Sequence, residues 1–280
     1  MASIIKEFAH LQIPLDDILK ATNNFANENI IGKGGFGNVY KGKLMRCGGE
    51  IINISARRLD RKHGQGDVEF WTEISVVSGF KHYYADYMIG FCDEKGEKII
   101  INRHQAMGSL SMHVSNPGFT WSQRLSVAFD IVEAIKYIHY DVDHRYHVIH
   151  RNINSSTILL DDKWKAKLSG FEFSIKHVVH RMNQVYLCEP IGTRGYMDPA
   201  VLKSGGVTHK SDIYSFGVVL FELLCGKKAV EDNKLLAPLA KHHYETGTLQ
   251  DIIHPDLWKQ MDPESFRCFS DAAYSCLEEK

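Results

Sequence analysis

The sequence predicts an α+β protein whose strands come early in the chain and whose long helices come later. Residues 50–59 alternate between apolar and polar side chains, and residues 98–102 form a second strand pattern. From residue 121 to residue 140, by contrast, apolar side chains recur every three or four positions, and residues 211–225 form an apolar helix pattern. With 280 residues, 44% of them hydrophobic, the chain can bury a full core as one large domain or as two lobes.

Composition excludes several classes of function. The net charge is -1, so no global field attracts nucleic acid or an anionic membrane. No apolar run reaches membrane-spanning length, and residues 1–20 lack the apolar core of a signal peptide. The six cysteines contain no CxxC pair and are expected as reduced thiols, which indicates a cytoplasmic protein. The 15 histidines are scattered without the spacing of metal ligands, so surface and core histidines are expected rather than a metal site.

The first 24 residues predict a short lead-in helix. Leu15, Ile18 and Leu19 form its apolar side, Pro14 starts it, and residues 22–24 end it. We expect an ordinary helix that docks on the domain behind it.

A glycine-rich loop follows at residues 31–40, with the pattern G-x-G-x-x-G-x-V between two short strands. Glycines let a backbone come close to phosphate groups, and the amides of such a loop can donate to phosphate oxygens. The pattern alone is weak, because a glycine-rich hairpin is also a common turn. A Rossmann site is excluded, since it requires a helix directly after the glycines.

Four later stretches, taken with this loop and in this order, resemble the motifs of protein kinases. They are the His-Arg-Asn stretch at His150, the Gly-Phe-Glu at Gly170, residues 192–200 and the Ser-Asp-Ile-Tyr-Ser-Phe-Gly at residues 211–217. The resemblance covers residues 25–280 and is closest to plant receptor-like and receptor-like cytoplasmic kinases. It implies a bilobal protein kinase fold with a small β-rich N-lobe that has one main helix and a larger, mostly helical C-lobe. The expected boundaries are a lead-in at 1–24, the N-lobe at 25–102, a hinge at 103–107 and the C-lobe at 108–280.

In the N-lobe the resemblance implies altered residues at the nucleotide site. Arg57 stands where the family has the lysine that contacts the α- and β-phosphates, and Ser55 puts a hydroxyl where the family has a methyl group. Asn102 falls at the gatekeeper position and makes the back of the site polar. Residues 68–78 are expected to form the main helix, in which Glu73 matches the family's glutamate. We expect an Arg57–Glu73 ion pair; the alternative is an exposed helical glutamate.

The expected nucleotide contacts follow from the same resemblance. We expect weak ATP binding at most, without magnesium. The residues placed around the nucleotide are Ile31, Gly32, Lys33, Gly34, Gly35, Phe36, Gly37, Val39, Ser55, Arg57, Arg103, Gln105 and Leu159.

The residues that perform the chemistry in the family are replaced together. Asn152 stands at the position of the catalytic aspartate, Asn154 at that of a lysine, and Thr157 and Gly170 at those of the two magnesium ligands. A carboxamide cannot accept a proton at neutral pH, and losing a general base costs about 10²–10⁴ in rate. Glu172 is expected as a solvated loop charge; the alternative is a displaced metal ligand.

The loop at residues 174–191 contains few residues that another kinase could phosphorylate. After Ser174 it contains no serine or threonine, and its only tyrosine is Tyr186. Arg151, which in the family pairs with a phosphorylated loop residue, therefore has almost no acceptor to meet. Ala200 replaces the glutamate that ends the family's loop motif.

By this resemblance, residues that maintain the fold are kept, among them Phe171 and Asp212. The residues that carry out phosphoryl transfer in the family are replaced. The resemblance therefore implies a pseudokinase that acts as a signalling scaffold or allosteric partner of an active kinase or receptor, in receptor or immune signalling. It implies a cytoplasmic location, or one at the inner face of the plasma membrane through segments outside this chain. One alternative is a weak or atypical serine/threonine kinase that uses Glu172; another is a module that binds nucleotide without metal and performs no chemistry.

Overall fold

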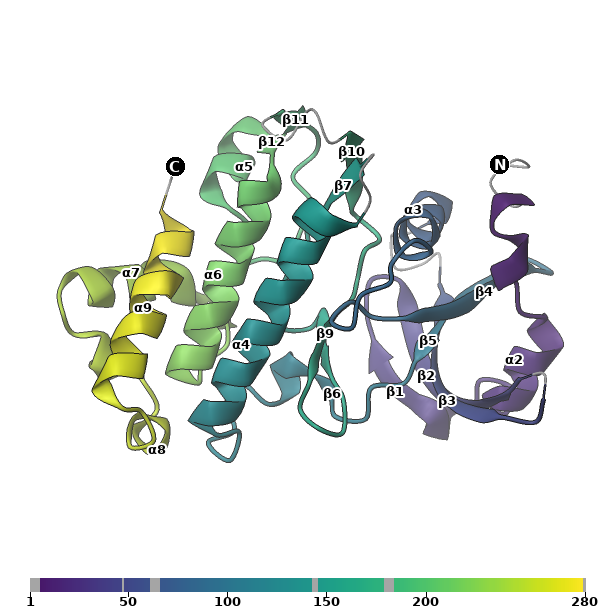
Figure 1. Cartoon of the computed structure of the whole chain (residues 1–280), viewed down its shortest axis with the longest axis horizontal. Helices are drawn as coiled ribbons and strands as arrows, with labels where there is room; N and C mark the ends of the chain where they lie inside the picture. The colour runs from purple at the N-terminus through teal and green to yellow at the C-terminus, as the bar shows by residue number, and fades with distance from the viewer. Residues whose placement is uncertain (1–5, 47, 61–65, 143–145, 179–183, 279–280) are drawn as a thin grey trace. The chain divides into compact units, whose positions relative to one another are not determined.

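The computed structural model describes residues 6–46, 48–60, 66–142, 146–178 and 184–278. Its residues group into two compact units (Figure 1). The first unit comprises Met1–Phe80 and Asp86–Ala106, and the second comprises Lys81–Ala85 and Met107–Lys280. The first unit is rich in strands and the second is mostly helical, which confirms the predicted α+β class.

A five-stranded antiparallel sheet forms the first unit, in the order β1-β2-β3-β5-β4. The predicted strand at 50–59 is β3, where Ile52, Ile54 and Ala56 are buried and the residues between them are mostly polar. Such alternation places one apolar face against a core. The strands are β1 (Ile30–Lys33), β2 (Gly37–Met45), β3 (Ile51–Leu59), β4 (Met88–Glu94) and β5 (Glu97–Arg103).

Helix α3 (Asp67–Val77), predicted at residues 68–78, packs on this sheet. Its first turn is capped where the Gly66 amide donates to the Glu69 carboxylate at 2.7 Å. Lys98 of β5 places its ammonium 5.0 Å from the ring centre of Phe70 and 5.3 Å from that of Trp71, both on α3. This cation–π contact ties the helix to the sheet.

The lead-in segment docks on the sheet as predicted, through α2 (Leu15–Ala21), which follows the short 3₁₀ turn η1 (Ala9–Leu11) and precedes η2 (Asn27–Asn29). Leu15 and Ile18 are buried in the apolar cluster of the sheet. Gly42 of β2 permits this contact, because a Cβ atom there would lie 2.6 Å from the Ala21 carbonyl oxygen. The absence of a side chain at position 42 thus sets how closely α2 approaches the sheet.

The residues before α2 pair with the outer strand β4. The Ile13 amide donates to the Phe91 carbonyl at 2.8 Å, and Gln12 forms a parallel bridge with Phe91. Gly90 leaves room for this pairing, since a Cβ atom there would overlap the Leu11 carbonyl oxygen. The segment is therefore part of the first unit's fold.

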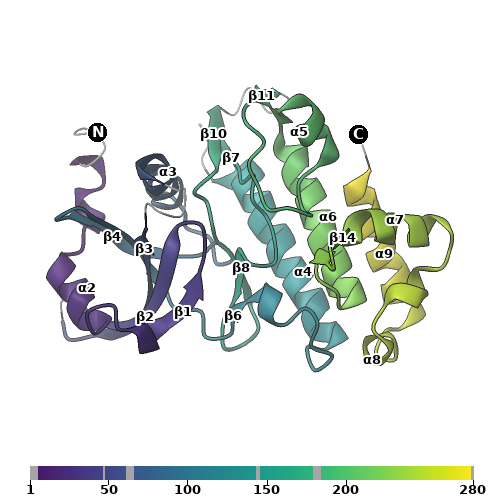
Figure 2. The ribbon, with the colours of Figure 1, turned by 180° about the vertical axis from the view of Figure 1, so that it is seen from behind.

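In the second unit α6, α7 and α9 lie side by side (Figures 1 and 2). The helix predicted at 121–140 is α4, which continues as a π-helical turn, η5 (Tyr137–Asp141). Four of the remaining helices begin at a residue whose side chain accepts a hydrogen bond from a backbone amide of the first turn. The helices and 3₁₀ turns are η4 (Leu110–Met112), α4 (Trp121–Lys136), α5 (Pro199–Ser204), α6 (His209–Cys225), α7 (Leu236–Glu245), η7 (Leu249–Ile252), α8 (Pro255–Trp258) and α9 (Pro263–Leu277).

Short antiparallel strands connect these helices. β8 pairs with both β6 and β9, β7 pairs with β10, and the other two pairs are β11–β12 and β13–β14. Among the described helices, none is both long and apolar enough to cross a bilayer. The strands are β6 (Gly108–Ser109), β7 (Tyr146–Ile149), β8 (Ile158–Leu160), β9 (Ala166–Leu168), β10 (Ile175–Val178), β11 (Tyr186–Leu187), β12 (Gly206–Val207), β13 (Val230–Glu231) and β14 (Lys234–Leu235).

The centre of the second unit holds a buried cation. Arg124 of α4 is 1% exposed and donates to four carbonyl oxygens, those of Phe119, Val114, Asn116 and Leu223, at 2.8 to 3.1 Å. Burial lowers its pKa to about 10. Its hydrogen bonds join α4, α6 and the segment between η4 and α4.

Candidate functional site

The glycine-rich loop is a tight β1–β2 hairpin. The amides and carbonyls of Gly34 and Gly37 bond to one another at 3.0 and 3.1 Å. Gly37 has φ +140°, and a Cβ atom there would collide with the Arg58 carbonyl, so this position requires glycine. Gly34 has open space around its Cα. The predicted loop is therefore formed as a tight hairpin, with open space beside Gly34.

Arg57 lies on β3 beside this loop and forms the predicted ion pair with Glu73 of α3. Glu73 is 2% exposed, so the alternative of an exposed helical glutamate is excluded. The Arg57 guanidinium carbon also lies 5.3 Å from the ring centre of Phe36, which is buried at the loop. The carboxylate and the ring together hold the guanidinium within the first unit.

A buried polar cluster that the sequence reasoning missed lies at the end of β5. Asn102 donates to the Asp86 carboxylate at 2.5 Å, and Gln105 donates to the same carboxylate at 3.3 Å. Burial raises the pKa of Asp86 to about 6, although the two amides and Arg57 oppose the shift. The polar character expected from Asn102 is therefore reinforced by a carboxyl group. Asp86 precedes an apolar strand, and no local pattern distinguished it.

Strand register sets where the other predicted nucleotide contacts lie. Adjacent strands pair Gly32 with Val39 and Val39 with Arg57, and Ser55 lies opposite Asn102. The register thus places these residues on adjacent strands of the first unit. Of the other predicted contacts, Ile31, Lys33, Gly34, Gly35 and Arg103 are exposed, and Leu159 lies on β8 of the second unit.

In the second unit the stretch from Asn152 to Thr157 satisfies its own polar groups. The Asn152 side-chain oxygen accepts hydrogen bonds from the Thr193 hydroxyl at 2.8 Å and from the Asn154 amide at 3.2 Å. The Thr157 hydroxyl contacts the carbonyls of Asn152 and Asn154 at 3.1 and 3.0 Å and accepts from the Asn154 backbone amide. These three residues form a closed network of amide and hydroxyl groups, which contains no carboxylate.

Position 170 is restricted to glycine by its own backbone conformation and by the neighbouring Thr157 side chain. It has φ +81°, in the left-handed region, and a Cβ atom there would lie 2.7 Å from the Thr157 Cγ2 methyl. The threonine that replaces one expected metal ligand thus occupies the space that a side chain at the other position would need. The two replacements fit one another sterically.

Glu172 differs from its expected state. It is only 9% exposed, so the expectation of a solvated loop charge is wrong. The neighbouring Phe171 packs against the His150 ring with centres 4.5 Å apart, and the Ser174 amide bonds to the Phe171 carbonyl at 3.1 Å. This turn draws Glu172 inward, and its Oε2 lies 3.6 Å from where a Cβ on Gly170 would stand.

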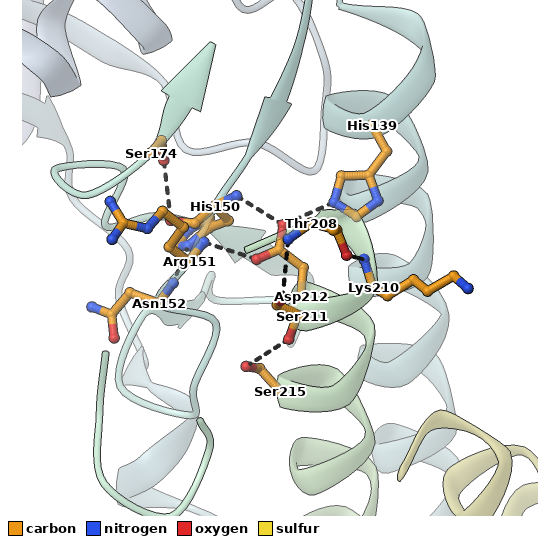
Figure 3. Close-up of polar contacts among 10 residues, drawn as sticks. All are labelled: His139, His150, Arg151, Asn152, Ser174, Thr208, Lys210, Ser211, Asp212 and Ser215. Carbon is orange, nitrogen blue, oxygen red and sulfur yellow. Dashed lines mark hydrogen bonds and ion pairs between the residues drawn. The ribbon is translucent and has the colours of Figure 1, made fainter. Parts of the chain in front are cut away.

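Asp212 at the start of α6 holds the backbone of the catalytic-loop stretch. Its carboxylate accepts the amides of His150 and Arg151, each at 2.8 Å, and the Nε2 of His139 at 2.8 Å (Figure 3). Burial alone would raise the pKa of Asp212, but the hydrogen bond from His139 and the charges of His139 and His150 lower it below its ordinary value. The predicted architectural role of Asp212 is present.

Arg151 binds the loop's main chain. Its guanidinium donates to the carbonyls of Phe173 at 3.1 Å and Glu189 at 2.9 Å. Phe173 directly precedes the loop at residues 174–191 and Glu189 lies near its far end, so one side chain holds the main chain at both ends of the loop. A loop with few possible phosphate acceptors is thereby held through neutral carbonyl groups.

The residues at positions 157 and 170 do not fit a magnesium site like that of the kinase family. Gly170 has no ligand atom, and the Thr157 hydroxyl is engaged by backbone groups. Magnesium prefers oxygen ligands, carboxylates above all, in near-octahedral geometry. Within the residues that the structure describes, no group of three or more His, Cys, Asp or Glu side chains is arranged to hold a metal ion.

Comparison with known proteins agrees with this architecture. The family model for the protein kinase domain matches residues 25–278. The chain is 37% identical over 274 residues to the receptor-like protein kinase ANXUR2 of Arabidopsis thaliana, which covers 95% of this chain and 31% of that protein. It is 34% identical to FERONIA of the same plant, covering 93% of this chain and 29% of that protein. The chain thus spans about a third of the length of these relatives. It belongs to the protein kinase domain family, and its relatives there are plant receptor-like protein kinases.

Proposed function

We propose that this chain is a pseudokinase domain, which keeps the kinase fold, does not transfer phosphoryl groups and acts as a signalling scaffold or allosteric partner. The observation that supports this most is the closed network of Asn152, Asn154 and Thr157 beside Gly170. Phosphoryl transfer requires positioned metal ions and a group that orients the attacking hydroxyl. Here amide and hydroxyl groups bond to one another at the positions that would supply both.

The contacts that fix the shape of each unit support a binding role. The Arg57–Glu73 ion pair and the Lys98 contact hold α3 on the sheet, and Asp212 and Arg151 hold the loops of the second unit. None of these contacts uses a nucleotide or a phosphate group. Units whose loops and helix are held by their own side chains present defined surfaces to a protein partner.

The partner class follows from the relatives, which are named receptor-like kinases. We propose an active kinase or receptor as partner, in receptor or immune signalling at the cytoplasmic side of the plasma membrane. Nucleotide binding in this proposal is weak and does not depend on magnesium, because the glycine loop is formed while the metal ligands are replaced.

The test is a phosphoryl-transfer assay with labelled ATP on the purified chain and a generic protein substrate. We expect no transfer above that of Asn152→Ala, and none after Asn152→Asp alone, since Thr157 and Gly170 still provide no carboxylate or amide ligand. Thermal melts with ATP, in magnesium and in chelator, measure binding in parallel; a ligand at a hundred times its Kd stabilises by about 2.7 kcal/mol. Magnesium-dependent transfer or a magnesium-dependent melting shift would refute the proposal.

One observation favours a second candidate, a weak atypical kinase. The buried Glu172 carboxylate lies beside Gly170, where it could substitute for the absent side chain. Under this candidate, transfer survives Asn152→Ala and is lost in Glu172→Gln, which keeps size and hydrogen bonding but removes the charge. The scaffold proposal expects the two variants to be equally inactive.

A further inference from the structure

Two buried histidines face each other across the β7–β10 ribbon. His147 of β7 and His177 of β10 are directly opposite in the antiparallel register, with ring centres 5.5 Å apart. They are 4% and 5% exposed. We refer to them as the histidine pair.

The rings of this pair have few polar partners. Neither ring nitrogen of His147 has a hydrogen-bond partner among the described residues, and the same holds for Nδ1 of His177. A buried polar group without a partner costs free energy. Hydrogen bonds to these three ring nitrogens therefore do not explain why the two histidines are buried here. Both rings pack against further aromatic side chains: Tyr140 lies 6.3 Å from His147, and Tyr186 lies 5.8 Å from His177.

Most of the surroundings of the pair disfavour protonation of the two imidazole rings. Burial lowers the pKa of His147, and His139 lowers it further, while Asp141 raises it. Burial also lowers the pKa of His177, followed by His147, His139 and His209. The Asp212 carboxylate of α6 is already bonded to His139 and the backbone. The described groups of neighbouring elements that contact the two rings or act on their charge are His139, Tyr140 and Asp141 of η5, His209 of α6 and Tyr186 of β11. Tyr146 and Lys176, next to the pair on its own strands, point to the other face of the ribbon and contact each other.

We propose that the histidine pair is an acid-sensitive contact that keeps β10 on β7 at neutral pH and releases it when the pH falls. The positions of the two strands give the release a consequence. β7 leads directly into His150 and Arg151, and β10 begins the loop whose ends Arg151 holds. Opening the ribbon therefore frees the start of this loop from the catalytic-loop stretch. The proposal concerns regulation of the loop and holds whether or not the domain transfers phosphate.

The direction with pH follows from proton linkage. Because the folded pKa of each histidine lies below the unfolded value of about 6.5, the open ribbon binds protons that the closed ribbon excludes. The stability that the two neutral histidines give to the closed β7–β10 ribbon is fully present above about pH 6.5 and decreases as the pH falls below that value. Each histidine shifts the opening equilibrium by at most about tenfold for each pH unit below about 6.5. One unit of the range from pH 7.5 to 5.5 lies below that value, so the pair allows at most about a hundredfold shift.

Hydrogen exchange read by mass spectrometry on the whole chain tests this proposal. Exchange is measured at pH 7.5 and 5.5 and corrected for the intrinsic pH dependence of amide exchange. We expect the opening equilibrium of residues 146–149 and 175–178 to rise at least tenfold at pH 5.5, while α9 changes little. In the His147→Phe/His177→Phe variant, which keeps two buried rings and cannot bind protons, we expect protection at both pH values. His242→Gln, an exposed histidine on α7, serves as the matched control and is expected to behave as the wild type.

Two results would overturn the proposal: an unselective rise that includes α9, or a pH response that persists in the double variant. If the double variant does not fold, the single His177→Phe variant is expected to show about half of the logarithmic response. Proton NMR titration of the wild-type histidines provides a further check. A pKa at or above 6.5 for both His147 and His177 would contradict the proposal regardless of the variants.

Discussion

Restoring a carboxylate at position 170 is the most direct perturbation of the altered site. Gly170 has φ +81°, where an L-residue costs about 1–2 kcal/mol. Its new Cβ would lie 2.7 Å from Cγ2 and 3.2 Å from Cβ of Thr157, and overpacking of this kind costs about 1–3 kcal/mol. We therefore expect Gly170→Asp to lower the free energy of unfolding by about 2–5 kcal/mol.

Thr157→Ser separates the steric part of this cost from the rest. Serine removes the Cγ2 methyl and keeps the hydroxyl that contacts the Asn152 and Asn154 carbonyls. The double variant is expected to recover about 1–2 kcal/mol relative to the sum of the single variants. The remaining cost is the left-handed backbone, together with like-charge repulsion from the buried Glu172 nearby.

The assay is urea denaturation of the wild type, both single variants and the double variant at pH 7.5 and 25 °C. Gly170→Ala is the matched control, since it meets the same methyl with the same backbone but adds no charge. Additivity of the two single changes within about 0.5 kcal/mol would refute the steric argument. Equal costs for Gly170→Ala and Gly170→Asp would refute the contribution of Glu172.

Three further predictions concern stability. Gly42→Ala places a Cβ against the Ala21 carbonyl and is expected to cost about 1–3 kcal/mol in chemical denaturation, with faster hydrogen exchange in α2. Glu222 is buried, and burial raises its pKa to about 7 despite hydrogen bonds from Tyr196, Ala229 and Ser155. The folded state therefore holds this proton more tightly, and the resulting stability, full below pH about 4.5, is lost as the pH rises through about 7. Glu222→Gln is thus expected to gain stability relative to the wild type at pH 8 and not at pH 5. Arg151→Gln removes the donors to the Phe173 and Glu189 carbonyls and is expected to raise exchange of residues 184–191 about tenfold, equivalent to about 1.4 kcal/mol.

Each of these predictions has a control or a contradicting result. Gly34→Ala is the control for Gly42→Ala, because its Cβ would meet nothing within 4 Å, and equal costs at the two positions would contradict the packing argument. For Glu222→Gln, the same change in stability at pH 5 and pH 8 would show that the carboxyl does not titrate as stated. Arg103→Gln, on an exposed side chain, controls for loss of charge, and loop exchange unchanged by Arg151→Gln would mean that other contacts hold the loop.

The sequence was sufficient where local patterns decide the structure. Alternation along residues 50–59 and the helical pattern at 68–78 located β3 and α3. The resemblance to protein kinases then put Arg57 and Glu73 in the register that predicted their ion pair. The lead-in helix was predicted for the same reason, since Leu15 and Ile18 share one side of a helix. Positive φ at Gly37 likewise agrees with a glycine pattern read as a tight loop.

The sequence was insufficient where distant segments meet. The cluster of Asp86 with Asn102 and Gln105 depends on the pairing of β4 with β5, and the histidine pair depends on the register of β7 against β10. Glu172 was expected in solvent because a charged residue in a loop usually is. Its burial results from the turn that packs Phe171 against His150, which is 21 residues earlier in the chain. No local pattern encodes such a contact.

The pairing of residues 11–13 with β4 has a practical consequence for work on this domain. β4 is the last strand of its sheet, and without that pairing its outer main-chain groups would be unsatisfied next to the apolar surface that α2 now covers. Bare strand edges of this kind recruit other polypeptides and lead to aggregation. A protein shortened to begin at Phe25, where the match to the kinase family begins, would therefore precipitate or self-associate during purification, whereas one that retains Phe8 and the residues after it would stay monodisperse.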